Sequence, residues 1–121
     1  MRQIKFRGKN NHGEWYFGGI ALDKKYIVDK FTFQMVRPET VGQFTGFYDK
    51  DSKEIYEGDV VKFEELPYIV KWNEKRGCFI YENDLTYNSL RNSDVCEIVG
   101  NIYDSPELFK NLQSEFLKNI R

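Results

Sequence analysis

Acidic side chains gather near the middle of the chain more densely than any other ionisable group. The five carboxylates are Asp49, Asp51, Glu54, Glu57 and Asp59. Asp49 could open a calcium-binding loop, but the sixth position is Glu54, where such a loop needs glycine, and the twelfth is Val60, where it needs a bidentate glutamate. We therefore expect a solvated, lysine-interleaved hairpin tip. Its candidate residues are Asp49, Asp51, Glu57 and Asp59.

A general acid and base pair is the second chemistry that this region could support. Glu57 and Asp59 follow the aromatic Tyr56, which could raise the pKa of one carboxyl group. The simpler interpretation is structural: Asp59 accepts hydrogen bonds from backbone N–H groups of the turn, and Glu57 faces water. A hydrolase or metal-dependent activity at this acidic tip is the third of the functional hypotheses that the sequence supports.

The sequence lacks the side chains for a catalytic nucleophile with its base and for a zinc site. The only histidine, His12, lies in a turn-like segment, and the two cysteines, Cys78 and Cys96, lie in apolar runs that predict buried strands. No glycine-rich phosphate loop precedes a helix. We predict a protein that is not an enzyme, with no catalytic residues, no metal site and no cofactor.

Basic and aromatic side chains lie together near the N-terminus. Lys5, Arg7 and Lys9 share one face of a predicted strand, since they occupy every second position. The returning strand brings Trp15 and Tyr16 beside them. Such a surface could neutralise phosphates and stack bases, or it could bind a protein partner. The formal net charge of −1, from 18 Lys and Arg against 19 Asp and Glu, argues against tight non-specific binding to nucleic acid.

Composition favours a small β protein. Tyr, Phe and Trp make up 17% of the 121 residues, which suits half-buried strands better than a helical bundle. The length allows one domain, or a small barrel with a β extension. No apolar run is long enough for a signal peptide or a membrane span, so we expect a cytoplasmic protein without membrane contact.

Alternating apolar and polar residues predict β-hairpins in the N-terminal part. The first hairpin joins residues 3–8 to residues 14–20. Residues 26–28 and 31–36 form either a second hairpin or one bent strand. A connection at residues 37–40 follows, because proline cannot donate to a strand ladder, and extended structure resumes at residues 41–47.

The rest of the chain predicts further strands. Residues 60–63 form a strand entered from the Glu57-Gly58-Asp59 turn, and residues 68–72 and 78–81 form the clearest hairpin. Residues 82–94 are expected to be a surface loop that tucks Leu85, Tyr87 and Leu90 inward. The last strand is predicted at residues 95–103.

A helix is expected to follow this strand. Asp104 or Ser105 can cap it, and Pro106 suits its first turn. The helix carries an apolar stripe that needs a partner surface, either on the end of the barrel or on another subunit. The stripe consists of Leu108, Phe109, Leu112, Phe116, Leu117 and Ile120.

Five short sequence blocks follow one another in a characteristic order and spacing. They are Ile4-Lys5-Phe6-Arg7-Gly8, Gly13-Glu14-Trp15, PETVGQFTG at 38–46, EIYEGDVV at 54–61 and VGNIY at 99–103. With these blocks the chain resembles the YopX family of phage and prophage proteins. The resemblance implies a mostly β, SH3-like fold with a C-terminal helix, an origin in a mobile element and a tendency to self-associate. It supplies no catalytic residues.

We therefore predict a mainly β chain that forms an SH3-like, partly open barrel with N-terminal β-hairpins and one C-terminal α-helix. Residues 1–121 are a single YopX-like domain, with a β extension at 1–44, the barrel at 45–104 and the helix at 105–121. The first functional hypothesis is a non-enzymatic binding module that forms a homo-oligomer and contacts a host or phage protein. The alternative is a nucleic-acid-binding accessory or regulatory protein.

Overall fold

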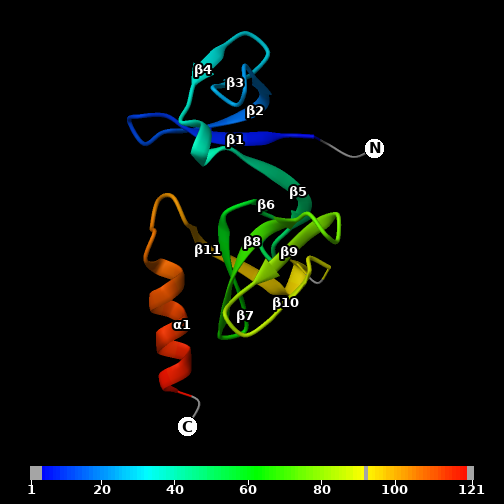
Figure 1. Cartoon of the computed structure of the whole chain (residues 1–121), viewed down its shortest axis with the longest axis vertical. Coiled ribbons are helices and arrows are strands. Elements are labelled where there is room, and N and C mark those ends of the chain that lie inside the picture. Colours follow the sequence, from blue (N-terminus) through cyan, green and yellow to red (C-terminus); the bar gives the residue numbers. More distant parts are fainter. Residues whose placement is uncertain (1–3, 92, 120–121) are drawn as a thin grey trace. The chain divides into compact units, whose positions relative to one another are not determined.

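The computed structural model describes residues 4–91 and 93–119, and Figure 1 shows their strands and helices. The chain divides into two compact units, which are residues 1–46 and residues 47–121. We call them the first unit and the second unit. Helix α1, with 11 residues, is too short to cross a membrane, and no other helix of the described chain is long and apolar enough to do so.

The first unit is built from short antiparallel strands. They are β1 (Phe6–Lys9), β2 (Trp15–Ala21), β3 (Tyr26–Val28), β4 (Phe33–Met35) and the start of β5 (Gly42–Tyr48). The sheet has the order β4-β3-β2-β1-β5-β6, in which β6 (Glu54–Tyr56) belongs to the second unit. The predicted first hairpin is confirmed by the pairing of β1 with β2. Of the two alternatives for residues 26–36, the hairpin is correct, since β3 pairs with β4.

The second unit holds a five-stranded antiparallel sheet with the order β10-β9-β8-β7-β11. Its strands are β7 (Asp59–Phe63), β8 (Leu66–Asn73), β9 (Cys78–Glu82), β10 (Tyr87–Ser89) and β11 (Cys96–Asn101), and β6 (Glu54–Tyr56) precedes them. Strands β10 and β11 lie at opposite ends of this order, so the sheet does not close on itself. The chain is thus mainly β, with two antiparallel sheets, and the expected barrel is corrected to open sheets.

The core of the second unit lies on one face of this sheet. Its buried members are Ile55, Val61, Tyr68, Val70, Phe79, Tyr81, Leu90 and Cys96. Three aromatic rings pack in direct contact: Phe63 stacks on Tyr81 with 4.3 Å between ring centroids, and Tyr68 meets Tyr81 edge-on at 4.7 Å. Offset and edge-on pairs of this kind add stability beyond the area that they bury. These three rings and the buried Phe79 form the aromatic part of the core of the second unit.

The segment at residues 82–94 departs from the predicted loop. Strand β10 lies within it, and the short 3-10 helix η2 (Ser93–Val95) begins at its end. Leu90 is buried as predicted, but Leu85 and Tyr87 are 61% and 49% exposed, so the prediction was wrong for both. The reason is a tight turn: the Asn83 side-chain oxygen accepts hydrogen bonds from the N–H groups of Leu85 and Thr86, which places the turn outside the core.

The predicted C-terminal helix is present as α1 (Leu108–Lys118) and packs on β8. It begins later than expected, and no side chain caps it. The Asp104 carboxylate instead accepts a hydrogen bond from the Asn101 amide at 3.0 Å, which closes the turn before the helix. Four members of the predicted stripe are half-buried, Leu117 is 43% exposed, and Ile120 lies outside the described residues.

A buried polar residue also fixes α1. The side chain of Gln113 accepts a hydrogen bond from the N–H of Asp84 at 3.0 Å and donates one to the Asp84 carboxylate at 2.8 Å. Gln113 is 7% exposed, so this bidentate contact replaces the water that its amide would otherwise bind. The helix is thereby linked to the turn between β9 and β10 as well as to β8.

The turn before β7 requires glycine at position 58. Gly58 has a φ of +91°, and a Cβ placed on it would lie 2.9 Å from Cε2 of Tyr103. We expect Gly58→Ala to lower the free energy of unfolding by about 2 kcal/mol, from backbone strain and the steric overlap together. Urea denaturation measures this change.

Gly77→Ala is the matched control for this substitution. Gly77 also has a positive φ, of +62°, but a Cβ there would meet no heavy atom within 4 Å. The free energy of unfolding should therefore fall by only about 1 kcal/mol in Gly77→Ala, from backbone strain alone. Equal losses for the two variants would show that the overlap with Tyr103 contributes nothing.

Candidate functional site

The predicted basic and aromatic residues of the first unit are largely brought together. The Arg7 guanidinium carbon lies 4.7 Å from the centroid of the Trp15 ring, and Lys9 Nζ lies 5.9 Å from the same ring. Lys5 Nζ lies 5.5 Å from the Phe44 ring. These distances are typical of cation–π interactions. The aromatic rings therefore already interact with cations of the same chain.

Two of the predicted residues are poorly placed for a common binding surface. Arg7 is only 7% exposed, so most of its surface is covered by the first unit. Tyr16 pairs in register with Gly8, whereas Trp15 pairs with Lys9. Because successive side chains of a strand alternate between its faces, Tyr16 points to the opposite side of β2 from Trp15. Lys5, Lys9 and Trp15 are half-buried and form the accessible part of this predicted surface.

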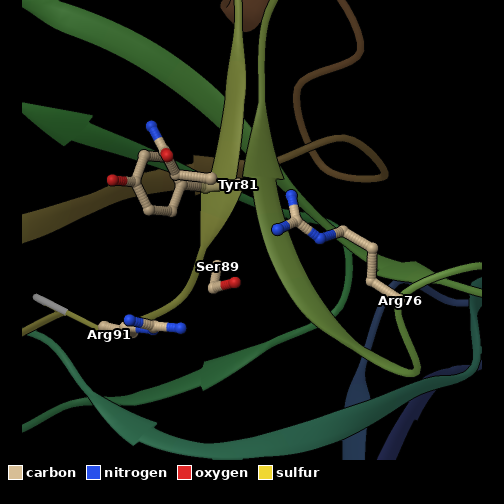
Figure 2. Close-up of a pocket in the computed structure, with 5 residues that line it drawn as sticks. Arg76, Tyr81, Ser89 and Arg91 are labelled. Carbon is tan, nitrogen blue, oxygen red and sulfur yellow. The ribbon is translucent and has the colours of Figure 1, made fainter.

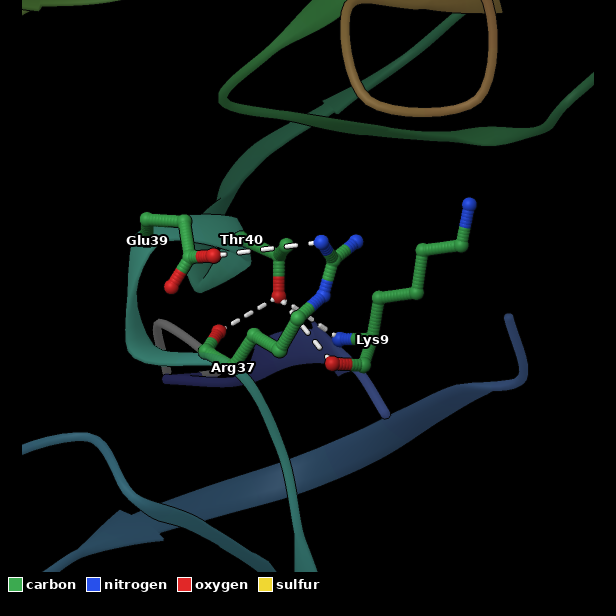
Figure 3. Close-up of polar contacts among 4 residues, drawn as sticks. All are labelled: Lys9, Arg37, Glu39 and Thr40. Atoms are coloured by element: carbon green, nitrogen blue, oxygen red, sulfur yellow. Dashed lines mark hydrogen bonds and ion pairs between the residues drawn. The ribbon is translucent and has the colours of Figure 1, made fainter. Parts of the chain in front are cut away.

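A buried threonine fixes the end of β1, as Figure 3 shows. The Thr40 hydroxyl accepts a hydrogen bond from the Lys9 N–H at 2.8 Å and donates to the Arg37 carbonyl oxygen at 2.7 Å. Thr40 ends η1 (Pro38–Thr40), the predicted connection, and is 1% exposed. An ion pair between Arg37 and Glu39, with 3.9 Å between Nη1 and Oε2, lies beside it. This junction positions the backbone that carries Lys9.

Asp49 does not belong to a solvated tip, and that expectation was wrong for this residue. It is 4% exposed, and its carboxylate accepts three backbone hydrogen bonds. Oδ1 accepts from the N–H groups of Asp51 and Lys53, and Oδ2 accepts from the N–H of Ile98 at 3.1 Å. Burial by itself raises the pKa of Asp49, but these hydrogen bonds and the charge of Lys53 outweigh it and hold the pKa below its ordinary value.

The other predicted acidic residues take different positions. Asp51 is exposed, while Glu57 is half-buried in the turn before β7. Asp59 is 2% exposed, so the expectation of a solvated tip was wrong for this residue too. Its Oδ2 accepts a hydrogen bond from the N–H of Tyr56 at 2.8 Å, as the structural interpretation predicted. In the described residues, no three His, Cys, Asp or Glu side chains form a group that could hold a metal ion. Asp49 and Asp59 therefore act as acceptors for turn backbone.

The two cysteines are free thiols of the second unit. Cys96 is fully buried, and burial followed by the nearby Asp49 charge raises the pKa of its thiol to about 11. A thiol with such a pKa stays protonated at neutral pH, so it is a poor nucleophile. Cys78 is half-buried with its Sγ 4.0 Å from Ser89 Oγ. His12 is exposed in the turn after β1, in the other unit.

An exposed apolar surface on β3 and β4 was not found from the sequence. The register places Val28 opposite Phe33 and Tyr26 opposite Met35, so these four side chains share one face of the hairpin. Phe33 and Met35 are 63% and 64% exposed. We call these residues the β3–β4 surface. The signal in the sequence was the apolar run at 31–36, but its pattern does not say which face is covered.

A polar pocket in the second unit was also missed. Its volume is about 400 Å³, and it is lined by Arg76, Tyr81, Asn88, Ser89 and Arg91, as Figure 2 shows. The two arginines come from different connections, 15 positions apart in the numbering, so no local motif joins them. Arg76 precedes β9 and Arg91 follows β10.

These observations define the structural class of the chain: it is mainly β, with two antiparallel sheets and a C-terminal helix. The family described as YopX protein matches residues 3–110, and the chain belongs to this family. The crystal structure of protein EF1440 from Enterococcus faecalis is similar, with a TM-score of 0.57 and 21% sequence identity. The similarity covers 90% of this chain and 99% of that chain, and it shows a shared fold. No curated protein matches this chain.

The buried carboxylate of Asp49 predicts a specific pH dependence. Asp49→Asn should lower the free energy of unfolding at pH 7 by about 2–3 kcal/mol, because an amide accepts these hydrogen bonds less well and adds a donor beside them. The folded pKa is lowered, so the contribution of Asp49 is complete above the unfolded pKa and is lost as the pH falls through the folded pKa. Urea denaturation at pH 7 and pH 3 measures both effects.

Asp51→Asn is the control, because Asp51 carries the same charge but is exposed. It should change stability by less than about 0.5 kcal/mol at either pH. A difference between wild type and Asp49→Asn that stays constant from pH 7 to pH 3 would contradict the role of the ionised carboxylate.

Proposed function

We propose that this YopX-family chain is a non-enzymatic binding module that acts by protein–protein interaction and associates with itself. The observation that carries the proposal is the exposed β3–β4 surface. Four side chains lie there on one face of a hairpin whose strands have three residues each. Phe33 and Met35 are exposed, Tyr26 and Val28 are half-buried, and Phe31 in the turn between the strands is 93% exposed. Contiguous exposed apolar surface of this kind is typical of interaction sites.

The position of β4 in its sheet supports the same proposal. It is the last strand in the order β4-β3-β2-β1-β5-β6, so among the described strands only β3 pairs with it. An edge strand offers N–H and C=O groups to which another strand can pair. A second copy of the chain could therefore combine backbone pairing at β4 with burial of Phe33 and Met35.

Further parts of the proposal concern origin, scaffold and chemistry. We take the chain to be encoded by a phage or prophage, to work in the host cytoplasm and to contain an SH3-like arrangement in its second unit. The Glu57-Gly58-Asp59 turn before β7 and the five antiparallel strands support that arrangement. The engagement of Asp49 and Asp59 with backbone N–H groups supports a structural role for these carboxylates.

Light scattering after size exclusion tests the self-association. We expect the wild-type chain to form a dimer or larger species at high micromolar concentration. The double variant Phe33→Lys/Met35→Lys should raise the dissociation constant by roughly 10-fold or more, since it removes the central apolar contacts. A wild-type chain that remains a monomer at high micromolar concentration and low salt would refute the self-association.

Leu85→Lys is the matched control for this variant. Leu85 is 61% exposed, close to the values for Phe33 and Met35, but it lies in the second unit. It should leave the assembly unchanged. If Leu85→Lys dissociates the assembly as strongly as the β4 variant does, the β3–β4 surface is not the interface.

The alternative function is nucleic-acid binding as an accessory or regulatory protein, through Lys5, Arg7, Lys9, Trp15 and Tyr16. The observation in its favour is the position of Lys9 and Arg7 over one aromatic ring. The burial of Arg7 restricts this function to the two lysines and the exposed part of Trp15. Cations beside a stacking platform are the usual equipment for binding single strands.

Titration of labelled single- and double-stranded oligonucleotides at low ionic strength tests this alternative. Binding should weaken steeply with added salt. In Lys5→Gln/Lys9→Gln, the slope of the logarithm of the binding constant against the logarithm of the salt concentration should fall by an amount that corresponds to roughly two phosphate contacts. Lys24→Gln/Lys30→Gln is the control, because these lysines are exposed outside the predicted surface. The absence of binding at low salt leaves only the protein-binding function.

A further inference from the structure

The pocket of the second unit is built on the β9–β10 edge of the sheet. The register places Ser89 opposite Ile80 and Asn88 opposite Tyr81, so strand pairing holds three of the lining residues in place. Leu90, which is 2% exposed, donates its N–H to the Phe79 carbonyl oxygen at 3.1 Å. The chain on either side of Ser89 is therefore fixed by pairing and by burial in the core.

The loop that carries Arg76 is also fixed by hydrogen bonds. The Asn73 side-chain oxygen accepts from the N–H of Arg76 at 2.8 Å, and the Asn73 carbonyl oxygen accepts from the N–H of Gly77 at 2.9 Å. Gly77 adopts a φ of +62°, which turns the chain into β9. The Arg76 guanidinium carbon lies 5.5 Å from the centroid of the Tyr87 ring, which orients the side chain across the sheet edge.

Arg91 reaches the same pocket from the other end of β10. Its N–H donates to the Ser89 carbonyl oxygen at 2.9 Å, which folds the chain back over Ser89. Figure 2 shows the guanidinium groups of Arg76 and Arg91 on either side of Ser89. The half-buried Ser89 hydroxyl lies between them.

The charge of this pocket is uncompensated in the described chain. No acidic residue lines it, and neither Arg76 nor Arg91 forms an ion pair with a residue that the structure describes. The Tyr81 hydroxyl points away from Ser89 in Figure 2, and its side chain bonds with Asn88. Burial raises the pKa of Tyr81, so this group stays neutral and adds no negative charge.

We infer that Arg76, Arg91 and Ser89 form a binding site for a phosphate group. Two guanidinium groups offer paired N–H donors that match the oxygens of a phosphate, and the serine hydroxyl supplies a further donor. The volume of about 400 Å³ lies within the ~300–1,000 Å³ usual for small-molecule sites, which leaves room for part of the molecule that carries the phosphate. Tyr87, which is 49% exposed beside Arg76, could contact that part.

This inference is independent of the proposed self-association, because its residues all lie in the second unit and those of the β3–β4 surface lie in the first. It also differs from the alternative function, which uses the lysines of β1. The chemistry that it requires is a phosphate, whether free in solution, in a phosphomonoester such as a nucleotide, or in the phosphodiester backbone of a nucleic acid.

Titrations of the full chain, followed by the amide signals of Ser89 and Gly77 in NMR spectra, test the site. The three probes are inorganic phosphate, adenosine 5′-monophosphate and a short oligothymidylate, each at constant ionic strength against chloride. At least one probe should shift both signals with a saturable curve. The probe that binds most tightly identifies the source of the phosphate.

Substitutions separate a built site from general attraction by charge. Arg76→Gln and Arg91→Gln should each raise the dissociation constant by roughly 10-fold, because each removes charge-assisted hydrogen bonds. Lys75→Gln is the matched control: Lys75 carries the same charge in the same loop, is exposed, and does not line the pocket. It should change the constant by less than about two-fold.

Arg76→Lys and Arg91→Lys provide a second pair, because lysine keeps the charge but loses the planar fork. They should bind more weakly than wild type and more tightly than the glutamine variants. All of these side chains are exposed, so the fold should be preserved, and the amide spectra check this directly. No signal shift with any probe, or equal losses for Lys75→Gln and the arginine variants, would overturn the inference.

Discussion

The Asp49 carboxylate joins two parts of the second unit that lie 49 positions apart in the sequence. It closes the turn after β5 through Asp51 and Lys53, and it accepts the N–H of Ile98 in β11. The neighbouring Lys50 N–H reinforces the link by donating to the Cys96 carbonyl oxygen at 2.9 Å. Because a buried carboxylate without hydrogen bonds would be strongly unfavourable, turn and strand must keep this arrangement together. This contact adds to the pairing with β7 that holds β11 in the sheet.

In the first unit, the corresponding contacts are made by cations and a hydroxyl group instead of a carboxylate. Arg7 is buried against the Trp15 ring, and Thr40 holds the backbone of Lys9 to the connection before β5. These contacts stabilise the β1 side of the sheet, where a binding surface had been expected. On β4, by contrast, Phe33 and Met35 remain exposed. The residues that stabilise the unit thus lie on β1 and next to it, whereas the exposed apolar residues lie on the edge strand β4.

Much of the fold could be predicted because strands and turns leave a local pattern. Alternation identified the hairpins, and the apolar stripe identified α1. The prediction for Leu85 and Tyr87 was wrong because it used only their apolar character. The hydrogen bond from the N–H of Leu85 to the Asn83 side chain forms a turn that leaves both side chains exposed. The helix start was placed early because Asp104 has the chemistry of a cap but bonds with Asn101. A side chain with several suitable partners cannot be assigned from its type alone.

The candidate sites were less predictable than the fold. The cations of β1 and Trp15 lie close together as expected, since the short hairpin between them fixes their register. The burial of Asp49, and the meeting of Arg76 with Arg91 around Ser89, could not be predicted from spacing. The sequence by itself determined most strands and the helix, because these leave a local pattern of residue types, and it determined the membership of the YopX family, because that depends only on the types and order of residues along the chain. Only the tertiary structure decided which charges are buried and which share a pocket, because these depend on pairing between distant strands.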